Sequence, residues 1–362
     1  MTMTPTTNAM INTATAPRAT LQQRIAQDPI ICAEGYLFEL ERRGYVQAGA
    51  FVPEAVIDHP EIVEQVHRDF VHAGSDVVEA FTYYAHREKL RIIGREHQLE
   101  QMNRGALAIA KKVAYETGTL FAGDICNTNV YDPADPKSIA ACRAMFEEQV
   151  EWAADAGVDY VIAETFSYGS EAKLALDIIK AAGLAACVTM TIHREPTTRD
   201  GLTPEDCCRM LADAGADVVG LNCIRGPKTM LPLIEKIVRA VPGVPVAALP
   251  VPYRTHEGEP TFQSLRDRAC DCIPGEMPFP VALDPFTCNR FEIAQFARSA
   301  VDLGVRYIGL CCGAMPHHIR SIAEAIGRKP PASRYSADMS KHAYFGTDQR
   351  LKTSNQKYAE KL

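Results

Sequence analysis

The sequence has 362 residues, with 38 lysines and arginines against 45 aspartates and glutamates, so its formal net charge at pH 7 is −7. This acidic balance, with no run of basic residues, excludes a nucleic-acid backbone as the partner and is typical of an enzyme that acts on small molecules. No apolar stretch reaches the roughly 18 residues that cross a bilayer, which excludes a membrane-spanning helix.

The N-terminal segment is rich in threonine and carries no clear helix or strand pattern, so we expect residues 1–27 to form a flexible tail. It has no apolar core of the signal-peptide type. A transit peptide is the alternative, because residues 1–23 contain no aspartate or glutamate. They contain a single arginine, Arg18, however, whereas transit peptides are rich in arginine. The 12 cysteines are scattered along a long chain, which favours a reducing compartment, and we expect a cytoplasmic protein.

A repeated pattern predicts the strands. Four segments place a glycine after a helical pattern and then, one residue later, an apolar run rich in β-branched side chains. Four further apolar runs lie between them. Such continuous runs are typical of parallel strands that are buried on both faces. The four segments are 72–83, 155–166, 213–224 and 302–313, and the four runs are 29–34, 119–125, 186–192 and 244–250.

Helical patterns separate the predicted strands, with apolar residues on one face of segments 62–70, 139–150, 230–238 and 319–326. Eight strand–helix alternations in about 300 residues predict an α/β fold, a (β/α)8 TIM-type barrel over residues 28–327. An open doubly wound sheet is the alternative, but no glycine-rich phosphate loop opens a helix. Residues 251–290 are expected to form a long loop after the seventh strand. The polar residues 328–362 are expected to form a C-terminal arm that contacts a partner subunit in a homo-oligomer.

Three cysteines follow predicted strands at the end of a barrel where active sites lie. Cys223 follows the sixth strand, and Cys311 and Cys312 follow the eighth, so their sulfurs are expected to converge on one Zn²⁺ with an open fourth position. Gly309 and Gly313 are expected to let the backbone bend around the pair. Two alternatives remain: the cysteines are small buried hydrophobes, or the adjacent pair forms a strained disulfide. The other cysteine clusters, 207–208 and 270/272, are assigned no metal.

A three-thiolate site predicts a particular chemistry. Zinc with three thiolates is a weak Lewis acid for hydrolysis, but it lowers the pKa of a substrate thiol in the fourth position and keeps that sulfur nucleophilic. The sequence therefore predicts attack of a substrate thiolate on an electrophilic carbon. Two rivals are a metal-free barrel lyase, which the lack of a lysine at any predicted strand end disfavours, and a thiol-based metal or redox sensor.

Aromatic and acidic residues surround this predicted site. Phe81, Tyr83 and Tyr84 lie at or just past the end of the second strand, where alternation would send Tyr84 to the opposite face, and Phe51 lies in the preceding loop. Aromatic faces attract an onium cation, although core packing is their commoner role. At strand ends, carboxylates are expected to bind an amino group or to form salt bridges in the barrel; they are Glu34, Asp124 and Glu164.

The motifs "RRGYVQAGAFVPEAV", "GLNC" and "LGVRYIGLCCGAMPHHIRSIAEAI" resemble those of the zinc-dependent homocysteine S-methyltransferase family, most closely its betaine branch, over residues 28–326. The resemblance implies a (β/α)8 barrel and zinc-dependent methyl transfer from glycine betaine to homocysteine, giving methionine. It matches Cys223, Cys311 and Cys312 to zinc ligands, and we place Asn222 among the substrate-binding residues. It matches Glu164 to the acid that contacts homocysteine and Tyr84 to an aromatic of the donor pocket, and Tyr83 lies where the branch has another. Beside them we expect Glu34 to bind homocysteine and Phe51 to line the donor pocket.

The chain departs from the family pattern at three positions. Ala33 stands where the family has aspartate, with Glu34 next to it; Phe51 stands where the betaine branch has tryptophan; and Thr165 stands where that branch has tyrosine. These changes surround both substrates. A sulfonium donor, dimethylsulfoniopropionate or S-methylmethionine, is therefore the alternative to glycine betaine.

Overall fold

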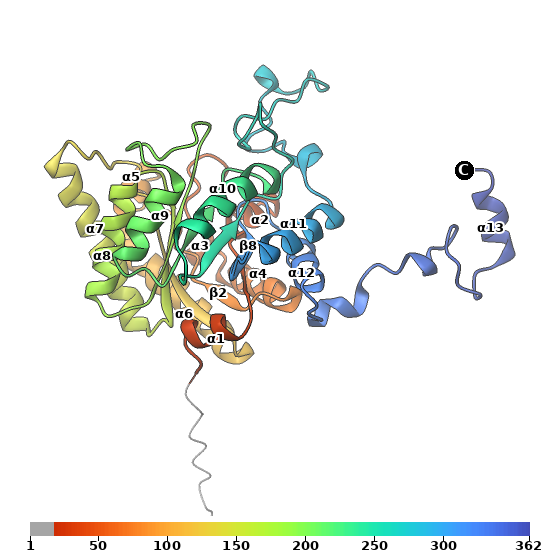
Figure 1. Ribbon diagram of the computed structural model, residues 1–362, viewed down its shortest axis with the longest axis horizontal. Coiled ribbons are helices and arrows are strands. Elements are labelled where there is room, and N and C mark those ends of the chain that lie inside the picture. The colour runs from red at the N-terminus through yellow and green to blue at the C-terminus, as the bar shows by residue number, and fades with distance from the viewer. Residues whose placement is uncertain (1–17) are drawn as a thin grey trace, which may run out of the picture.

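Eight parallel strands form a barrel at the centre of the computed structural model, which describes residues 18–362 (Figure 1). Their hydrogen-bonded order is β1-β8-β7-β6-β5-β4-β3-β2. Asp76 completes the ring between β1 and β2: its N–H donates to Ile31 O over 2.7 Å, and its carboxylate accepts from Ile31 N over 2.8 Å. The predicted TIM-type barrel is confirmed. The strands are β1 Ile30–Ala33, β2 Val77–Glu79, β3 Leu120–Cys126, β4 Tyr160–Phe166, β5 Ala186–Met190, β6 Val218–Asn222, β7 Val246–Leu249 and β8 Tyr307–Leu310.

Helices enclose the barrel, and each predicted apolar face packs inward. In α4 the buried side chains include Val63, Val66 and Phe70, as the pattern requires. The four glycines of the repeated pattern have φ between 75° and 115°, as expected for the ends of helices. The helices are α1 Leu21–Gln27, α2 Tyr36–Arg42, α3 Ala55–Asp58, α4 Pro60–Ala73, α5 Arg87–Ile92, α6 Leu99–Thr117, α7 Pro136–Ala156, α8 Gly169–Ala181, α9 Pro204–Asp213, α10 Pro227–Ala240, α11 Arg290–Asp302, α12 Pro316–Ala325 and α13 Thr353–Ala359.

The N-terminal tail is shorter than predicted. Residues 21–27 form helix α1, which a Thr20–Gln23 capping box starts and whose Leu21 and Ile25 are buried at the bottom of the barrel. Arg306 also donates to Ile25 O. The prediction of a flexible segment is therefore wrong for residues 21–27, because two apolar side chains one helical turn apart are enough to anchor it. The rest of the predicted tail up to residue 17 lies outside the described residues.

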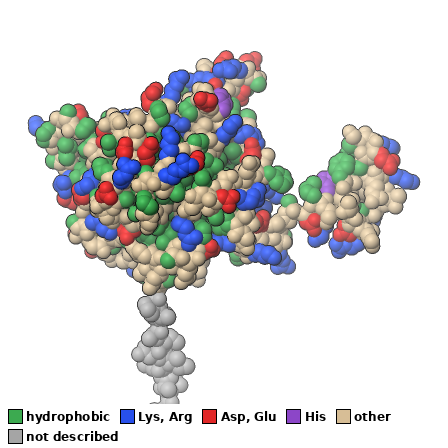
Figure 2. All heavy atoms as spheres, viewed as in Figure 1, with side chains coloured by type: hydrophobic (Ala, Val, Ile, Leu, Met, Phe, Trp, Pro, Cys, Tyr) green, Lys and Arg blue, Asp and Glu red, His purple; other side chains and the backbone are tan. Residues whose placement is uncertain are grey.

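The C-terminal arm begins later than residue 328. Arg328 pairs with Asp28 and Asp76 over 2.6 and 2.5 Å, which ties this position to the barrel. Beyond the short helix Pro331–Tyr335 the chain extends away from the barrel and ends near α13 (Figure 1). Acidic and basic side chains intermix over the visible face (Figure 2). Within the described residues, no helix is both long and apolar enough to cross a membrane.

The predicted loop after β7 is irregular, with short 3-10 helices at Pro274–Glu276 and Asp284–Phe286. Cys270 and Cys272 form a disulfide within it. The loop returns toward the carboxyl ends of the strands, where its Phe262 and Phe279 line a cavity. It therefore covers part of the barrel mouth.

Candidate active site

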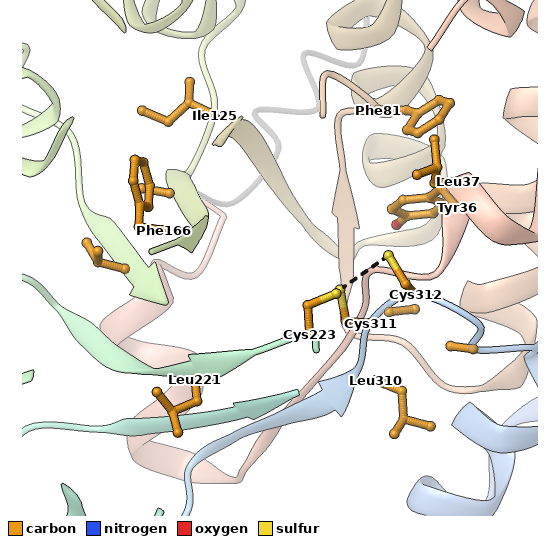
Figure 3. Packing of buried hydrophobic residues seen from close by; sticks show 14 of the residues in the cluster. Tyr36, Leu37, Phe81, Ile125, Phe166, Leu221, Cys223, Leu310, Cys311 and Cys312 are labelled. Carbon is orange, nitrogen blue, oxygen red and sulfur yellow. Dashed lines mark hydrogen bonds between the residues drawn. The ribbon is translucent and has the colours of Figure 1, made fainter. Parts of the chain in front are cut away.

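Three thiols meet at the carboxyl ends of β6 and β8. The Sγ atoms of Cys223, Cys311 and Cys312 all lie within 4.8 Å of one another, and those of Cys311 and Cys312 are 3.9 Å apart. Figure 3 shows the three side chains pointing toward one another. Tetrahedral zinc with Zn–S bonds of about 2.3 Å holds its sulfurs about 3.8 Å apart. The cluster thus has the donor set and the spacing of a zinc-type metal site.

Strand β7, which lies between β6 and β8, holds the three cysteines in register. Cys223 N donates to Leu249 O over 2.9 Å, and Cys311 N donates to Pro250 O over 3.0 Å, so two consecutive carbonyls at the end of β7 fix both cysteines.

The two glycines predicted to bend the backbone, Gly309 and Gly313, have different roles. A Cβ on Gly309 would lie 1.8 Å from Cys32 O, so glycine there permits the close approach of β8 to β1. Gly313, with φ 95°, turns the chain after the cysteine pair.

In the absence of metal the three sulfurs share protons unequally. Hydrogen bonds from Cys311 and Cys312 hold the pKa of the Cys223 thiol well below its usual range. Burial raises the pKa of the Cys311 thiol. The hydrogen bond between Cys312 and Cys223 raises the pKa of the Cys312 thiol. These shifts favour the thiolate form at Cys223, and a metal ion that bound all three sulfurs would release the protons of the other two thiols.

A small inner cavity of about 20 Å³ lies directly beside the cysteine pair. Four buried carboxylates line it together with Tyr36, Leu37 and Phe81. Burial raises the pKa of each of these carboxyls, and the charge of a neighbouring acid or thiolate raises it further. They are Glu34, Glu79, Asp124 and Glu164.

Asn222 connects the carboxylates to the thiols. It is 0% exposed, and its Oδ1 accepts from Thr165 N over 2.9 Å. Its Nδ2 lies within 3.2 Å of Glu34 Oε2 and 3.8 Å of Cys311 Sγ, and also donates to Glu164. The side chain lies beneath both cavities instead of lining them. It orients Glu34 and Glu164, which line the inner cavity.

A larger outer cavity of about 310 Å³ opens above the thiols and includes Cys223 and Cys312 in its wall. The predicted Phe51, Tyr83 and Tyr84 all line it. The prediction that Tyr84 faces away is wrong, because β2 already ends at Glu79 and strand alternation stops there. The rings of Tyr83 and Tyr84 are 4.2 Å apart between centroids.

The outer cavity also contains groups that the sequence did not single out. Lys89 Nζ lies 4.0 Å from the centroid of the Tyr84 ring, and Arg199 reaches the same cavity. Phe38, Phe262 and Phe279 add aromatic surface. A lysine three residues into a helix gives no sequence signal, and the two later phenylalanines belong to an irregular loop whose path no periodicity predicts.

Unusual backbone conformations concentrate at this outer cavity. Among residues 18–362, seven non-glycine residues have positive φ, and six of them line this cavity. In this region the Cβ crowds the backbone, so each costs on the order of 1 kcal/mol or more and persists only where surrounding contacts enforce it. The six residues are Phe51, Tyr84, Asn129, Thr165, Cys223 and Ile224.

A family model described as homocysteine S-methyltransferase matches residues 30–326, which includes the whole barrel and all three cysteines. The chain belongs to the homocysteine S-methyltransferase family. Members transfer a methyl group to the thiol of homocysteine, and the thiol cluster at the barrel mouth is the metal-binding centre expected of them.

Named relatives of this family differ in their methyl donor. The betaine–homocysteine S-methyltransferase 1 of Danio rerio is 36% identical over 93% of this chain and 82% of its own length. The S-methylmethionine–homocysteine S-methyltransferase of Mus musculus is 35% identical over 93% and 89%. The metallated homocysteine methyltransferase MmuM of Escherichia coli shares the fold, with a TM-score of 0.63 and 20% identity over 82% of this chain and 96% of its own. Sequence similarity thus establishes the family and leaves open which donor is used.

Proposed function

We propose that this chain transfers a methyl group from glycine betaine to homocysteine with the help of one zinc ion, forming methionine. The observation that carries the proposal is the shared wall of the two cavities: the thiols of Cys223 and Cys312 face the aromatic outer cavity, and the Cys311–Cys312 pair faces the acidic inner one. Bound to the three thiolates, zinc would lower the pKa of the acceptor thiol and hold it as a nucleophile.

The acceptor is oriented by the inner residues. Glu164, with Glu34 beside it, accepts hydrogen bonds from the amino group, while Asn222 holds both carboxylates in place. The burial of these groups keeps water from the reacting sulfur. Holding the two reactants in line supplies a large part of the rate enhancement, and no side chain needs to move a proton in the methyl-transfer step.

The donor occupies the outer cavity, with its methylated head against Phe51, Tyr83 and Tyr84 through cation–π attraction. Lys89 and Arg199 support a donor that carries a carboxylate and no ammonium group, because they place two positive charges at the same cavity. Glycine betaine has this charge pattern. S-methylmethionine, the donor named for the mouse relative, carries an ammonium that these two cations would repel.

Metal analysis followed by a donor panel tests this function. We expect about one zinc per chain and methionine formation from homocysteine with glycine betaine, at a kcat/KM at least about tenfold above that with S-methylmethionine. Dimethylsulfoniopropionate, which has a carboxylate and no ammonium, is expected to rank between them. A zinc-loaded protein that uses S-methylmethionine best would contradict the donor assignment, and turnover without metal would contradict the mechanism.

Removal of one aromatic face tests the donor cavity. Tyr84→Ala is expected to raise the KM for glycine betaine about tenfold, because the onium head loses a cation–π contact, with zinc content unchanged. Tyr84→Phe is the matched control, since it keeps the ring and the Cβ at this left-handed position and removes only the hydroxyl. Equal donor kinetics in the alanine and phenylalanine variants would rule out the aromatic contact.

The C-terminal arm supports a homo-oligomer. It carries exposed apolar side chains that find no cover on their own barrel (Figure 2). They are Tyr335, Met339, Tyr344, Phe345, Tyr358 and Leu362. Removal of residues 337–362, which leaves Arg328 and its ion pairs intact, is expected to convert the protein to a monomer in light scattering. An unchanged mass per particle would refute the contact.

A further inference from the structure

The inner cavity contains more carboxyl groups than one amino group requires. Its four carboxylates come from four neighbouring strand ends: Glu34 after β1, Glu79 in β2, Asp124 in β3 and Glu164 in β4. None of the described residues that line it is a lysine, an arginine or a histidine. Residues 18–362 therefore place no positive charge within the cavity itself.

Several of these oxygens have no partner within the described residues. They are Glu34 Oε1, both Oε atoms of Glu79 and Asp124 Oδ1. Glu34, Glu79 and Asp124 are 6%, 2% and 5% exposed, so bulk water does not hydrogen-bond to these oxygens. A buried carboxylate without a donor is costly, and such groups in native proteins normally have a cation or a hydrogen-bond donor. A ligand that carries an ammonium group would supply the missing donors.

The spacing of the oxygens fits an ammonium group. One carboxylate oxygen each from Glu79, Asp124 and Glu164 lies within 4.8 Å of the other two, and a primary ammonium has three N–H donors to offer them. The cavity volume of about 20 Å³ accommodates one water-sized group. Oxygens of Glu34 and Glu164 also lie within 4.8 Å of Cys311 Sγ, so a short alkyl chain joins the sulfur cluster to this ammonium position.

The same cavity offers nothing to a carboxylate. No cationic side chain of the described part of the chain lines it, four acids surround it, and it has room for one small group only. An α-carboxylate on the acceptor has to point out of the inner cavity and gains no ion pair there. The ammonium is thus the acceptor group that the inner cavity can anchor, and an α-carboxylate adds nothing to that contact.

We propose that this enzyme also methylates aminothiols that lack a carboxylate, with Glu79 and Asp124 as the residues that determine this specificity. The proposal rests on the methyl-transfer function above. The acceptor thiol loses its proton, a new S–CH₃ bond forms, and the C–N bond of the donor breaks with its electron pair remaining on nitrogen. A thioether amine and a neutral tertiary amine result, and nothing is oxidised or reduced.

Three acceptors that differ by one group test the proposal with the zinc-loaded enzyme and its best donor. They are homocysteine, 3-aminopropane-1-thiol, which lacks the carboxylate, and 4-mercaptobutyrate, which lacks the amine. We expect kcat/KM for the aminothiol to be at least about one third of that for homocysteine, and that for mercaptobutyrate to be lower by about a hundredfold or more. An aminothiol value below one third overturns the proposal.

Two conservative variants assign the effect to the acids. Glu79→Gln and Asp124→Asn are each expected to raise the KM for the aminothiol about tenfold or more with zinc retained. Glu151→Gln, an exposed glutamate on α7, is the matched control and is expected to leave it unchanged. An unchanged KM in both inner variants overturns the assignment.

A binding measurement separates this proposal from the methyl-transfer function. Propylammonium chloride is expected to raise the melting temperature of the metal-free protein more than potassium chloride at the same concentration, and less so in Asp124→Asn. Equal effects of the two salts overturn the ammonium site, because they show a site for any small cation. Failure of every thiol to turn over, with the propylammonium effect present, refutes the methyl transfer and leaves the ammonium site in place.

Discussion

Cys311→Ser is expected to abolish metal binding and methyl transfer together, with kcat/KM lower by about a thousandfold or more. The Cys311 sulfur lies 3.9 Å from that of Cys312 and belongs to a cluster in which each sulfur is within 4.8 Å of the others. A serine hydroxyl is a hard, protonated ligand that cannot replace a thiolate in such a soft site. Zinc content by atomic emission and methionine formation are measured on the same preparation.

Cys142→Ser is the matched control. Cys142 is equally buried but lies away from the cluster, and its Sγ is 3.1 Å from Thr128 Oγ1, so a serine hydroxyl there keeps a hydrogen-bond partner. It should retain zinc and activity. Methyl transfer that persists in metal-free Cys311→Ser would exclude the metal-dependent mechanism, whatever the state of the fold.

Asn222→Ala is expected to lower the free energy of unfolding by about 2 to 4 kcal/mol and to raise the KM for homocysteine strongly. The substitution removes one amide that serves Thr165 N, Glu34 and Glu164 in a fully buried position. The two carboxylates lose a shared donor, so they turn away from the orientation that binds the acceptor. Denaturant unfolding and acceptor kinetics measure the two effects.

Asn103→Ala separates stability from site geometry. Asn103 is also buried, and its Nδ2 donates to Ala85 O and Leu99 O, away from the inner cavity. Its loss is expected to lower stability without changing the KM for homocysteine. An Asn222→Ala variant with normal acceptor kinetics would show that the amide supports the fold alone.

Much of the fold was predictable from the sequence, because the strands of a buried parallel barrel are continuous apolar runs that follow a glycine. The convergence of Cys223 with Cys311 and Cys312 was predictable for the same reason: each follows a strand, and the ends of parallel strands meet at one rim. What could not be predicted is where a strand stops. Glu79 was overlooked because the apolar pattern continues to Phe81, whereas β2 ends at Glu79.

The cavities depended on features with no periodic signal. Lys89 lies over the Tyr84 ring, close to a sharp turn of the chain at Tyr84, whose φ is 60°. The aromatic side chains of the loop after β7 reach the outer cavity along an irregular path. Helix α1 carries too few apolar residues for a pattern, and its place follows from tertiary packing at the bottom of the barrel.

The six left-handed residues around the outer cavity have a consequence for laboratory evolution. Selection for heat resistance alone would favour glycine at positions such as Asn129, an exposed residue with φ 62°, where relief of the crowded Cβ removes little packing. Each such substitution would loosen the wall of the outer cavity, which in the proposed function holds donor and acceptor in line. We therefore expect variants selected only for a higher melting temperature to turn over substrate more slowly. Screens of this scaffold need to measure turnover together with the melting temperature.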